Sequence, residues 1–194
     1  MKDELLSLLK DLERIDADER KQGLPVDQRM RNIQPEVGLF LNILIKATKA
    51  KTILEIGTSN AYSTIWIGLA AKENNGKVIT LENDPKKTQL AKENLGKAGL
   101  LNIVQIIQGD AKETIKGIEE TLDLIFIDAE KEDYIDFFDL TFPKLKVGGL
   151  IVADNVVSHD SVLKPYVDHV RNNPQTQSVL VPIGRGEELT LKIR

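Results

Sequence analysis

The feature that most constrains the fold is an alternation of short apolar runs with helical segments, which begins near residue 50. The runs have the length of a strand and are apolar throughout, as expected for strands that are buried on both faces. Parallel strands must be joined by crossover segments, which are usually helices. We therefore predict an α/β fold with a parallel sheet built from Thr52–Ile56, Lys77–Leu81, Ile103–Ile107, Leu122–Ile127 and Leu150–Ala153.

Helix signals lie before these strands and between them. The first twenty residues place leucines at helical spacing, and Pro35 and Pro85 stand where a first helical turn would begin. Asp110 and Glu113 have the spacing of a capping box at a helix start. These signals predict a short helix after Asp110 and longer ones over about residues 1–20, 35–49, 61–71, 85–98, 131–145 and 162–171.

The chain ends in two predicted strands, Ser178–Pro182 and Leu189–Ile193, with a tight turn between them around Gly184 and Gly186. A turn this short can join only antiparallel neighbours. We therefore expect a Rossmann-like, doubly wound sheet of seven strands that is mostly parallel and carries a C-terminal antiparallel hairpin. No repeat or linker divides the chain, so we expect residues 1–194 to form a single domain, with residues 1–30 as an N-terminal helical arm.

Composition narrows the possible functions. The formal net charge is −4, from 26 basic and 30 acidic residues that are interspersed along the chain. No global positive field therefore exists to hold nucleic acid or an anionic membrane. The absence of cysteine excludes disulfides, zinc–thiolate centres and cysteine nucleophiles. Because there is no export signal and no apolar stretch long enough to span a bilayer, we expect a cytoplasmic protein.

Acidic side chains stand at the ends of five consecutive predicted strands. In open α/β sheets, ligands bind beyond the carboxyl ends of the strands, near the point where the strand order reverses. Clustered like charges repel one another, and their desolvation adds to the cost. We therefore expect a cationic ligand or a metal ion among these residues: Glu55, Glu82, Asp110, Asp128 and Asp154, with Asn155 beside the last.

The turn after the first strand, Glu55-Ile-Gly57-Thr-Ser-Asn-Ala61, contains one glycine. Dinucleotide-binding proteins need three glycines here to bring the backbone against a pyrophosphate, so NAD-dependent oxidoreduction is disfavoured. A carboxylate just ahead of the glycine suits a ligand with a positive amine, and Glu82 suits the hydroxyls of a ribose. Asp110 is suited either to capping the next helix or to contacting an adenine, and the two are compatible.

These turns carry a family resemblance. Glu-Ile-Gly-Thr at 55–58, Leu-Glu-Asn-Asp at 81–84 and Gly-Asp-Ala at 109–111 resemble the cofactor motifs of class I S-adenosylmethionine-dependent methyltransferases. From about Arg31 to the C-terminus, the chain is most similar to the catechol and caffeoyl-CoA O-methyltransferase group, including its small bacterial members. The segments that carry this resemblance are I-x-P-x-x-G at 33–38, E-I-G-T-x-x-x-Y-S-T at 55–64, F-I-D-A-x-K-x-x-Y at 126–134 and D-N-V at 154–156.

The resemblance implies a cofactor, a metal and a base. In that group the methionyl end of S-adenosylmethionine lies on the first turn, its ribose on the acidic end of the second strand and its adenine near the third. The matching cofactor residues are Glu55, Gly57, Ser63, Glu82, Asp110, Ala111 and Asp128. The divalent metal is held by the residues that match Asp128, Asp154 and Asn155, and Lys131 matches the general base.

Physical chemistry agrees with that assignment. Two carboxylates and an amide offer only hard oxygen ligands, which suit Mg²⁺ first and also Ca²⁺ or Mn²⁺. Such an ion lowers the pKa of hydroxyls that chelate it. An ammonium close to a metal is pushed towards its neutral form, so Lys131 could accept a proton. The alternatives are a turn after a strand for Asp154 and Asn155, and a surface lysine for Lys131.

We therefore expect an O-methyltransferase that acts on a small catechol-like or vicinal hydroxyl acceptor, and the resemblance implies a homodimer. One alternative is a methyltransferase with a nucleic-acid or protein acceptor, although the chain lacks an N/D-P-P-Y/F motif for amino methylation. Another is a cofactor-binding protein that has lost turnover.

Two departures from the group bear on these alternatives. Ala61 stands where relatives usually have glycine, and a positive φ there would be strained. The hairpin reads Gly-Arg-Gly-Glu-Glu at 184–188, where relatives more often have Gly-Asp-Gly, so Arg185, Glu187 and Glu188 are candidates for tuning substrate choice. His159 has no partner motif, and we assign it no catalytic role.

Overall fold

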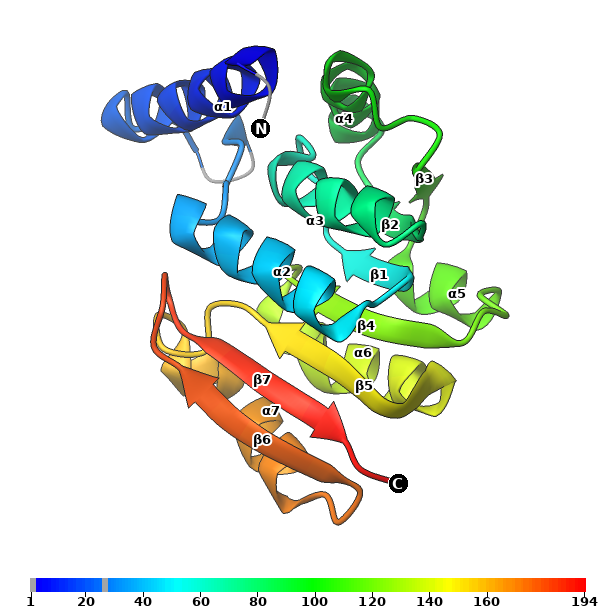
Figure 1. The fold of residues 1–194 in the computed structure, drawn as a ribbon. Coiled ribbons are helices and arrows are strands. Elements are labelled where there is room, and N and C mark those ends of the chain that lie inside the picture. Colours follow the sequence, from blue (N-terminus) through cyan, green and yellow to red (C-terminus); the bar gives the residue numbers. More distant parts are fainter. Residues whose placement is uncertain (1–2, 26–27) are drawn as a thin grey trace.

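The computed structural model describes residues 3–25 and 28–194 and contains a seven-stranded sheet in the order β3-β2-β1-β4-β5-β7-β6 (Figure 1). The first five strands pair in parallel, whereas β7 is antiparallel to both β5 and β6. The predicted Rossmann-like fold with a C-terminal antiparallel hairpin is therefore confirmed. The strands are β1 (Thr52–Ile56), β2 (Lys77–Glu82), β3 (Val104–Gln108), β4 (Leu122–Ile127), β5 (Leu145–Ala153), β6 (Thr176–Val181) and β7 (Glu187–Lys192).

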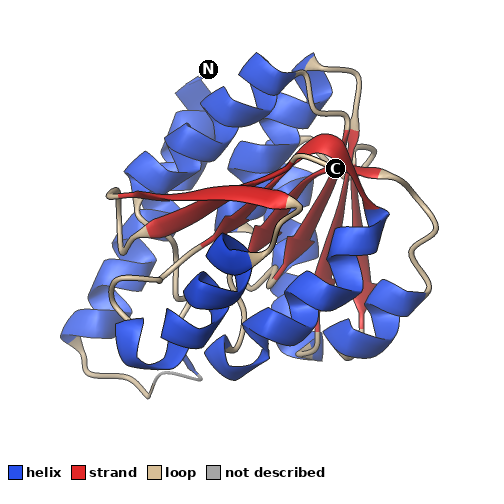
Figure 2. Cartoon of the chain, turned by 90° about the horizontal axis from the view of Figure 1, so that it is seen from below, coloured by secondary structure: helices blue, strands red, loops and turns tan. Residues whose placement is uncertain are grey.

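Helices cover both faces of the sheet (Figure 2). One apolar core joins the sheet to α2 (Pro35–Thr48), α3 (Tyr62–Glu73) and α4 (Pro85–Ala98). A second core joins the opposite face to α5 (Ala111–Lys116), α6 (Tyr134–Thr141) and α7 (Asp160–Asn172). The crossovers on one face lead from β1 towards β3, and those on the other lead from β3 through β4 to β5.

The alternation of side chains along each strand divides the core between these two layers. In β1, Ile53 packs in the core beneath α3, whereas Leu54 and Ile56 pack in the core of the other face. Successive side chains of a strand point to opposite faces, so Glu55 also points towards α3. Its side chain is fully buried there.

Two predicted elements differ from the observed ones by more than two residues at an end. The helix expected over 131–145 is a 3-10 turn (Lys131–Asp133), then α6, then a second 3-10 turn (Phe142–Lys144). Pro143 lies in that last turn, where its missing N–H prevents an α-helical hydrogen bond. Strand β5 begins at Leu145 and not at Leu150, because its pairing with β4 continues through an irregularity between Leu122 and Leu124.

The N-terminal helix α1 (Asp3–Lys21) packs on the layer that contains α2 and α3 (Figure 1). Leu9 and Leu12 are buried, and the Tyr62 hydroxyl donates a hydrogen bond of 2.6 Å to Glu13. The predicted arm, residues 1–30, includes residues 1–2 and 26–27, which lie outside the described residues. Within the described ranges, no helix combines the length and the apolar character that crossing a membrane requires.

Candidate active site

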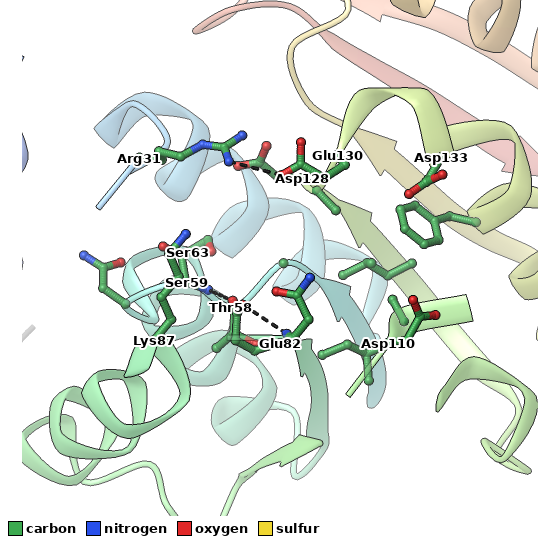
Figure 3. Close-up of a pocket in the computed structure, with 18 of the residues that line it drawn as sticks. Arg31, Thr58, Ser59, Ser63, Glu82, Lys87, Asp110, Asp128, Glu130 and Asp133 are labelled. Carbon is green, nitrogen blue, oxygen red and sulfur yellow. Dashed lines mark hydrogen bonds and ion pairs between the residues drawn. The ribbon is translucent and has the colours of Figure 1, made fainter. Parts of the chain in front are cut away.

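A cavity of about 930 Å³, including its open mouth, lies at the carboxyl ends of β1 to β4 (Figure 3). The strand order reverses here. The strands β2 and β3 lie in sequence on one side of β1, and β4 and β5 lie in sequence on its other side. Ligands of open α/β sheets bind at such a point. Of the seven predicted cofactor residues, Gly57, Ser63, Glu82, Asp110, Ala111 and Asp128 line this cavity.

Gly57 sets the distance between the ends of β1 and β4. Its φ is +106°, which lies in the region that favours glycine, and a Cβ there would stand 2.1 Å from the backbone oxygen of Asp128. Its backbone N–H donates to the carbonyl oxygen of Leu81 at 3.1 Å. Backbone therefore meets backbone at the floor of the cavity, and no other residue type fits at position 57.

The carboxylate of Glu82 is held by backbone donors. One oxygen accepts from Ser59 N at 2.7 Å, and the other accepts from Asn83 N and Asp84 N at 3.0 Å each. The side chain is buried yet lines the cavity. Such an anchored carboxylate is suited to accept hydrogen bonds from a ligand that carries hydroxyls.

Asp110 begins helix α5. Its Oδ1 accepts from Lys112 N at 2.8 Å and from Glu113 N at 3.2 Å, so the predicted cap is confirmed. The reciprocal half of the capping box is replaced, because Glu113 instead accepts from Lys116 Nζ at 2.7 Å. Since Asp110 and Ala111 also line the cavity, capping and ligand contact are compatible at this position.

The structure does not place Glu55 in the cavity wall. Its carboxylate lies behind the wall and accepts from Ser63 Oγ at 2.6 Å, Thr64 Oγ1 at 2.5 Å and Thr80 Oγ1 at 2.6 Å. Burial raises its pKa to about 7, although these three hydroxyls lower it in part. The predicted direct contact between Glu55 and a ligand amine has no support in this geometry, because position 55 is an inner strand position. Its observed effect is to fix the hydroxyl of Ser63.

The three predicted metal ligands are brought together at the ends of β4 and β5. Asn155 Nδ2 donates to Asp128 Oδ1 at 2.9 Å, and Asn155 N donates to Asp154 Oδ1 at 2.6 Å. Asn155 has a φ of +74°, a left-handed conformation that asparagine tolerates better than most residues and that recurs at functional sites.

Lys131 is buried beside this group and is not the surface lysine of the alternative reading. Its Nζ donates to Asp128 Oδ1 and Ala129 O at 2.9 Å each and to the Tyr134 hydroxyl at 3.0 Å. The Tyr134 hydroxyl is in turn 3.2 Å from the carbonyl oxygens of Ile127 and Asp154. Tyr134 is fully buried, so it packs in the core and orients the lysine.

The sequence offered Glu187 only as a candidate for tuning substrate choice, whereas the structure places it beside the predicted metal ligand Asp154. The Glu187 side chain is fully buried, and its carboxyl group forms a hydrogen bond with that of Asp154, which requires one of the two groups to be protonated. Burial, and then the charge of Asp154, raises the pKa of Glu187. Burial, and then the charge of Asp128, raises the pKa of Asp154. Glu187 therefore favours its protonated form and can donate a hydrogen bond to Asp154.

Whether Asp128, Asp154 and Asn155 suit a metal ion can be judged from their donor atoms. Within the described ranges, no cluster of three His, Cys, Asp or Glu side chains is arranged to hold a metal. The predicted set has two carboxylates and one amide, and the amide nitrogen faces Asp128. A rotation of the amide by half a turn would present its oxygen instead. The carboxylates of Asp128 and Asp154 and an amide oxygen of Asn155 would form a set of hard oxygen donors, which suits a divalent cation.

A second cavity of about 650 Å³ adjoins the first. Asp128, Lys131, Asp154 and Asn155 lie in its wall together with His159, to which the sequence gave no role. Both cavities share Arg31, Asn32 and Asp128 in their walls. The segment between α1 and α2 therefore contributes to both cavities, and strand-end reasoning could not find it because no strand precedes it.

Ala61 has a φ of +69°, which is the strained positive value considered from the sequence for this position. Its side chain is fully buried in the core beneath α3 and does not line either cavity. The unfavourable conformation therefore strains the start of α3 without narrowing the space for a ligand.

Comparison with known proteins places these observations in a family. A family model described as O-methyltransferase matches residues 4–192. The chain is 42% identical over 136 residues to a catechol O-methyltransferase of Niastella koreensis and 36% identical over 132 residues to one of Mycobacterium tuberculosis. Both matches cover 68% of this chain, and they span only 61% and 60% of the lengths of those relatives.

The fold also matches a solved structure. An O-methyltransferase from Bacillus cereus in complex with SAH superposes with a TM-score of 0.83 at 27% identity, covering 99% of this chain and 92% of that chain.

Proposed function

The chain belongs to the O-methyltransferase family, and we propose that it transfers the methyl group of S-adenosylmethionine to a hydroxyl oxygen of a small acceptor. One observation carries this proposal: two adjoining cavities share Asp128, and Lys131 donates to that residue from the wall of the second. The first cavity would hold the methyl donor, and the second would hold the acceptor.

The first cavity has the groups that the methyl donor requires. S-adenosylmethionine supplies an electrophilic methyl group on a sulfonium when it is bound. The anchored carboxylate of Glu82 would accept hydrogen bonds from its ribose, and Asp110 and Ala111 would lie at its adenine. Gly57 and Ser63 would leave room for its methionyl end.

Asp128, Asp154 and Asn155 would hold a divalent cation, Mg²⁺ first and Ca²⁺ or Mn²⁺ as alternatives. A bound cation acidifies hydroxyl groups that coordinate it. Lys131 Nζ would receive the acceptor's proton, because Tyr134 orients the nitrogen and Lys131 lines the second cavity. Catechol-like acceptors, which carry two adjacent hydroxyls, suit this arrangement.

Titration calorimetry and a methylation assay test this proposal. We expect the chain to bind S-adenosylmethionine, to methylate catechol in the presence of Mg²⁺ and to lose turnover when a chelator is added. Asp154→Ala should retain cofactor binding, because Asp154 does not line the first cavity, and should lose turnover. Full activity of this variant, or activity that survives thorough chelation, would remove the metal from the mechanism.

The predicted homodimer and cytoplasmic location stay predictions. Two large apolar side chains of α2, Leu39 and Ile43, are 48% and 56% exposed, and they offer one surface for association between copies. Sedimentation analysis of the wild type and of Ile43→Glu would test that surface, with a monomeric wild type as the contrary result.

A further inference from the structure

The wall of the second cavity carries a surplus of positive charge. Its lining contains five basic side chains and two acidic ones, and the acidic ones are the carboxylates already assigned to the metal group. The basic residues come from α1, from the segment that follows it, from the turn after β4 and from the β6–β7 hairpin: Arg20, Arg29, Arg31, Lys131 and Arg185.

The arginines of this wall are neutralised unequally. Arg20 is paired with Asp16 at 2.7 Å, and Arg31 makes a longer contact of 3.4 Å with Glu130, whose side chain is 70% exposed. Arg29 donates to a backbone carbonyl. Arg185 has neither an ion pair nor a side-chain hydrogen bond to any residue in the described part of the chain. The positive charge of Arg185 is therefore available to a ligand.

His159, in the same wall, responds to this positive charge. Partial burial lowers the pKa of its imidazole, and neighbouring cations lower it further. Those cations are Lys131, Arg185 and Arg31, from three separate segments of the chain. The positive charges of these three segments therefore all reach the imidazole of His159.

The backbone around Arg185 is held firmly. Its carbonyl oxygen accepts from Val157 N at 3.0 Å and from Ser158 N at 3.1 Å. The next residue, Gly186, packs so closely on Val157 that a Cβ would lie 2.4 Å from a side-chain carbon. The hairpin tip is thus fixed against the loop after β5.

We propose that the second cavity selects acceptors that carry a carboxylate in addition to their hydroxyls, and that Arg185 is the residue that determines this specificity. A guanidinium binds a planar carboxylate through two parallel hydrogen bonds, which a neutral acceptor cannot form. The cavity is open to solvent and lined by both the arginine and the predicted metal ligands, so one acceptor could present its carboxylate to the first and its hydroxyls to the second. This inference rests on the proposed function for the identity of the cavity as the acceptor site.

The test compares two acceptors that differ only in charge, 3,4-dihydroxybenzoate and 3,4-dihydroxybenzamide. Calorimetry in the presence of Mg²⁺ and S-adenosylhomocysteine should show roughly tenfold tighter binding of the acid to the wild type, as one charge-assisted hydrogen bond would give. Arg185→Gln should abolish this preference and Arg185→Asp should reverse it. Arg14→Gln, which alters an exposed arginine of α1 that does not line the cavity, should leave it unchanged.

The outcomes separate the inference from the proposed function. Equal binding of acid and amide by the wild type, or an undiminished preference in Arg185→Gln, would overturn the inference even if both compounds are methylated. Selective binding of the acid that depends on Arg185, without methylation of either compound or of catechol, would overturn the proposed function and leave only the carboxylate-binding role of Arg185 standing. Circular dichroism and S-adenosylhomocysteine affinity verify that the variants are folded, because Arg185 does not line the first cavity.

Discussion

The two cavities share a wall but are built in different ways. The first is shaped by backbone: Gly57 meets the carbonyl of Asp128, and three backbone N–H groups hold Glu82. The second is shaped by long side chains that converge from the N-terminal arm, the loop after β5 and the C-terminal hairpin. Backbone contacts fix the first cavity for one ligand, whereas arginine side chains can be exchanged without moving a strand. Under the proposed function, the methyl donor would be fixed by the sheet, and the choice of acceptor would depend on the segments attached to it.

The largest effect is expected at the wall that the cavities share. Lys131→Met should lower kcat by about 10³-fold, since removal of a general base typically costs 10²–10⁴-fold. The dissociation constant of S-adenosylmethionine should change little, because Lys131 lines only the second cavity. Steady-state kinetics and calorimetry measure the two quantities. Lys164→Met, at an exposed lysine of α7, is the matched control. A variant at position 131 that keeps wild-type kcat would separate the lysine from catalysis.

A change of backbone tests the first cavity. Gly57→Ala should lower the free energy of unfolding by about 4 kcal/mol, because it adds a backbone clash to an unfavourable positive φ. Gly99→Ala shares the positive φ, but its Cβ would meet no atom within 4 Å, so it should cost only about 1 kcal/mol. Urea unfolding measures both. Equal losses in the two variants would mean that the floor of the cavity can yield.

A buried acid behind the first cavity gives a smaller effect that depends on pH. The pKa of Glu55 is raised by burial from 4.5 to about 7, so the folded chain favours the protonated form. The stability that this preference contributes is full below about pH 4.5 and is lost as the pH rises through about 7. As the pH rises from 5 to 8, the free energy of unfolding of Glu55→Gln should therefore increase relative to that of the wild type by up to about 3 kcal/mol.

Denaturant titrations at the two pH values measure this gain. Asp123→Asn is the control. Burial alone would raise the pKa of Asp123, but Lys146 and the backbone N–H groups of Thr52 and Lys51 together lower it. Asp123 is thus ionised throughout this range, and its variant should show a constant difference from the wild type. A constant difference for Glu55→Gln would mean that its carboxyl group is charged in the folded chain.

The contrast between the cavities also explains what the sequence could predict. The end of a strand is recognisable from its apolar run, so Gly57, Glu82, Asp110 and Asp128 were found from local pattern and all line the first cavity. The same pattern did not show that Glu55 lies off the cavity wall, because the alternation of side chains along β1 points it under α3; its contact with a cofactor stays a prediction.

The second cavity was only partly predictable, because its wall depends on which distant segments meet. Arg20, Arg29 and Arg31 precede the first strand, and no spacing rule connects them to residue 154 or residue 185. Glu187 and Glu188 are adjacent and both buried, yet only Glu188 has a cationic partner, Arg171. That distinction arises from the position of β7 between β5 and β6, which the sequence of the hairpin does not specify.

Asp128 touches both halves of the site: its backbone oxygen lies against Gly57, and its carboxylate accepts from Lys131 and Asn155. If a ligand in one cavity displaces this residue, it can change the affinity of the other cavity for its ligand. The second ligand then changes the affinity for the first by the same factor, since coupling free energies are reciprocal. If the two cavities hold donor and acceptor as proposed, a single aspartate would couple their binding without any movement of a domain.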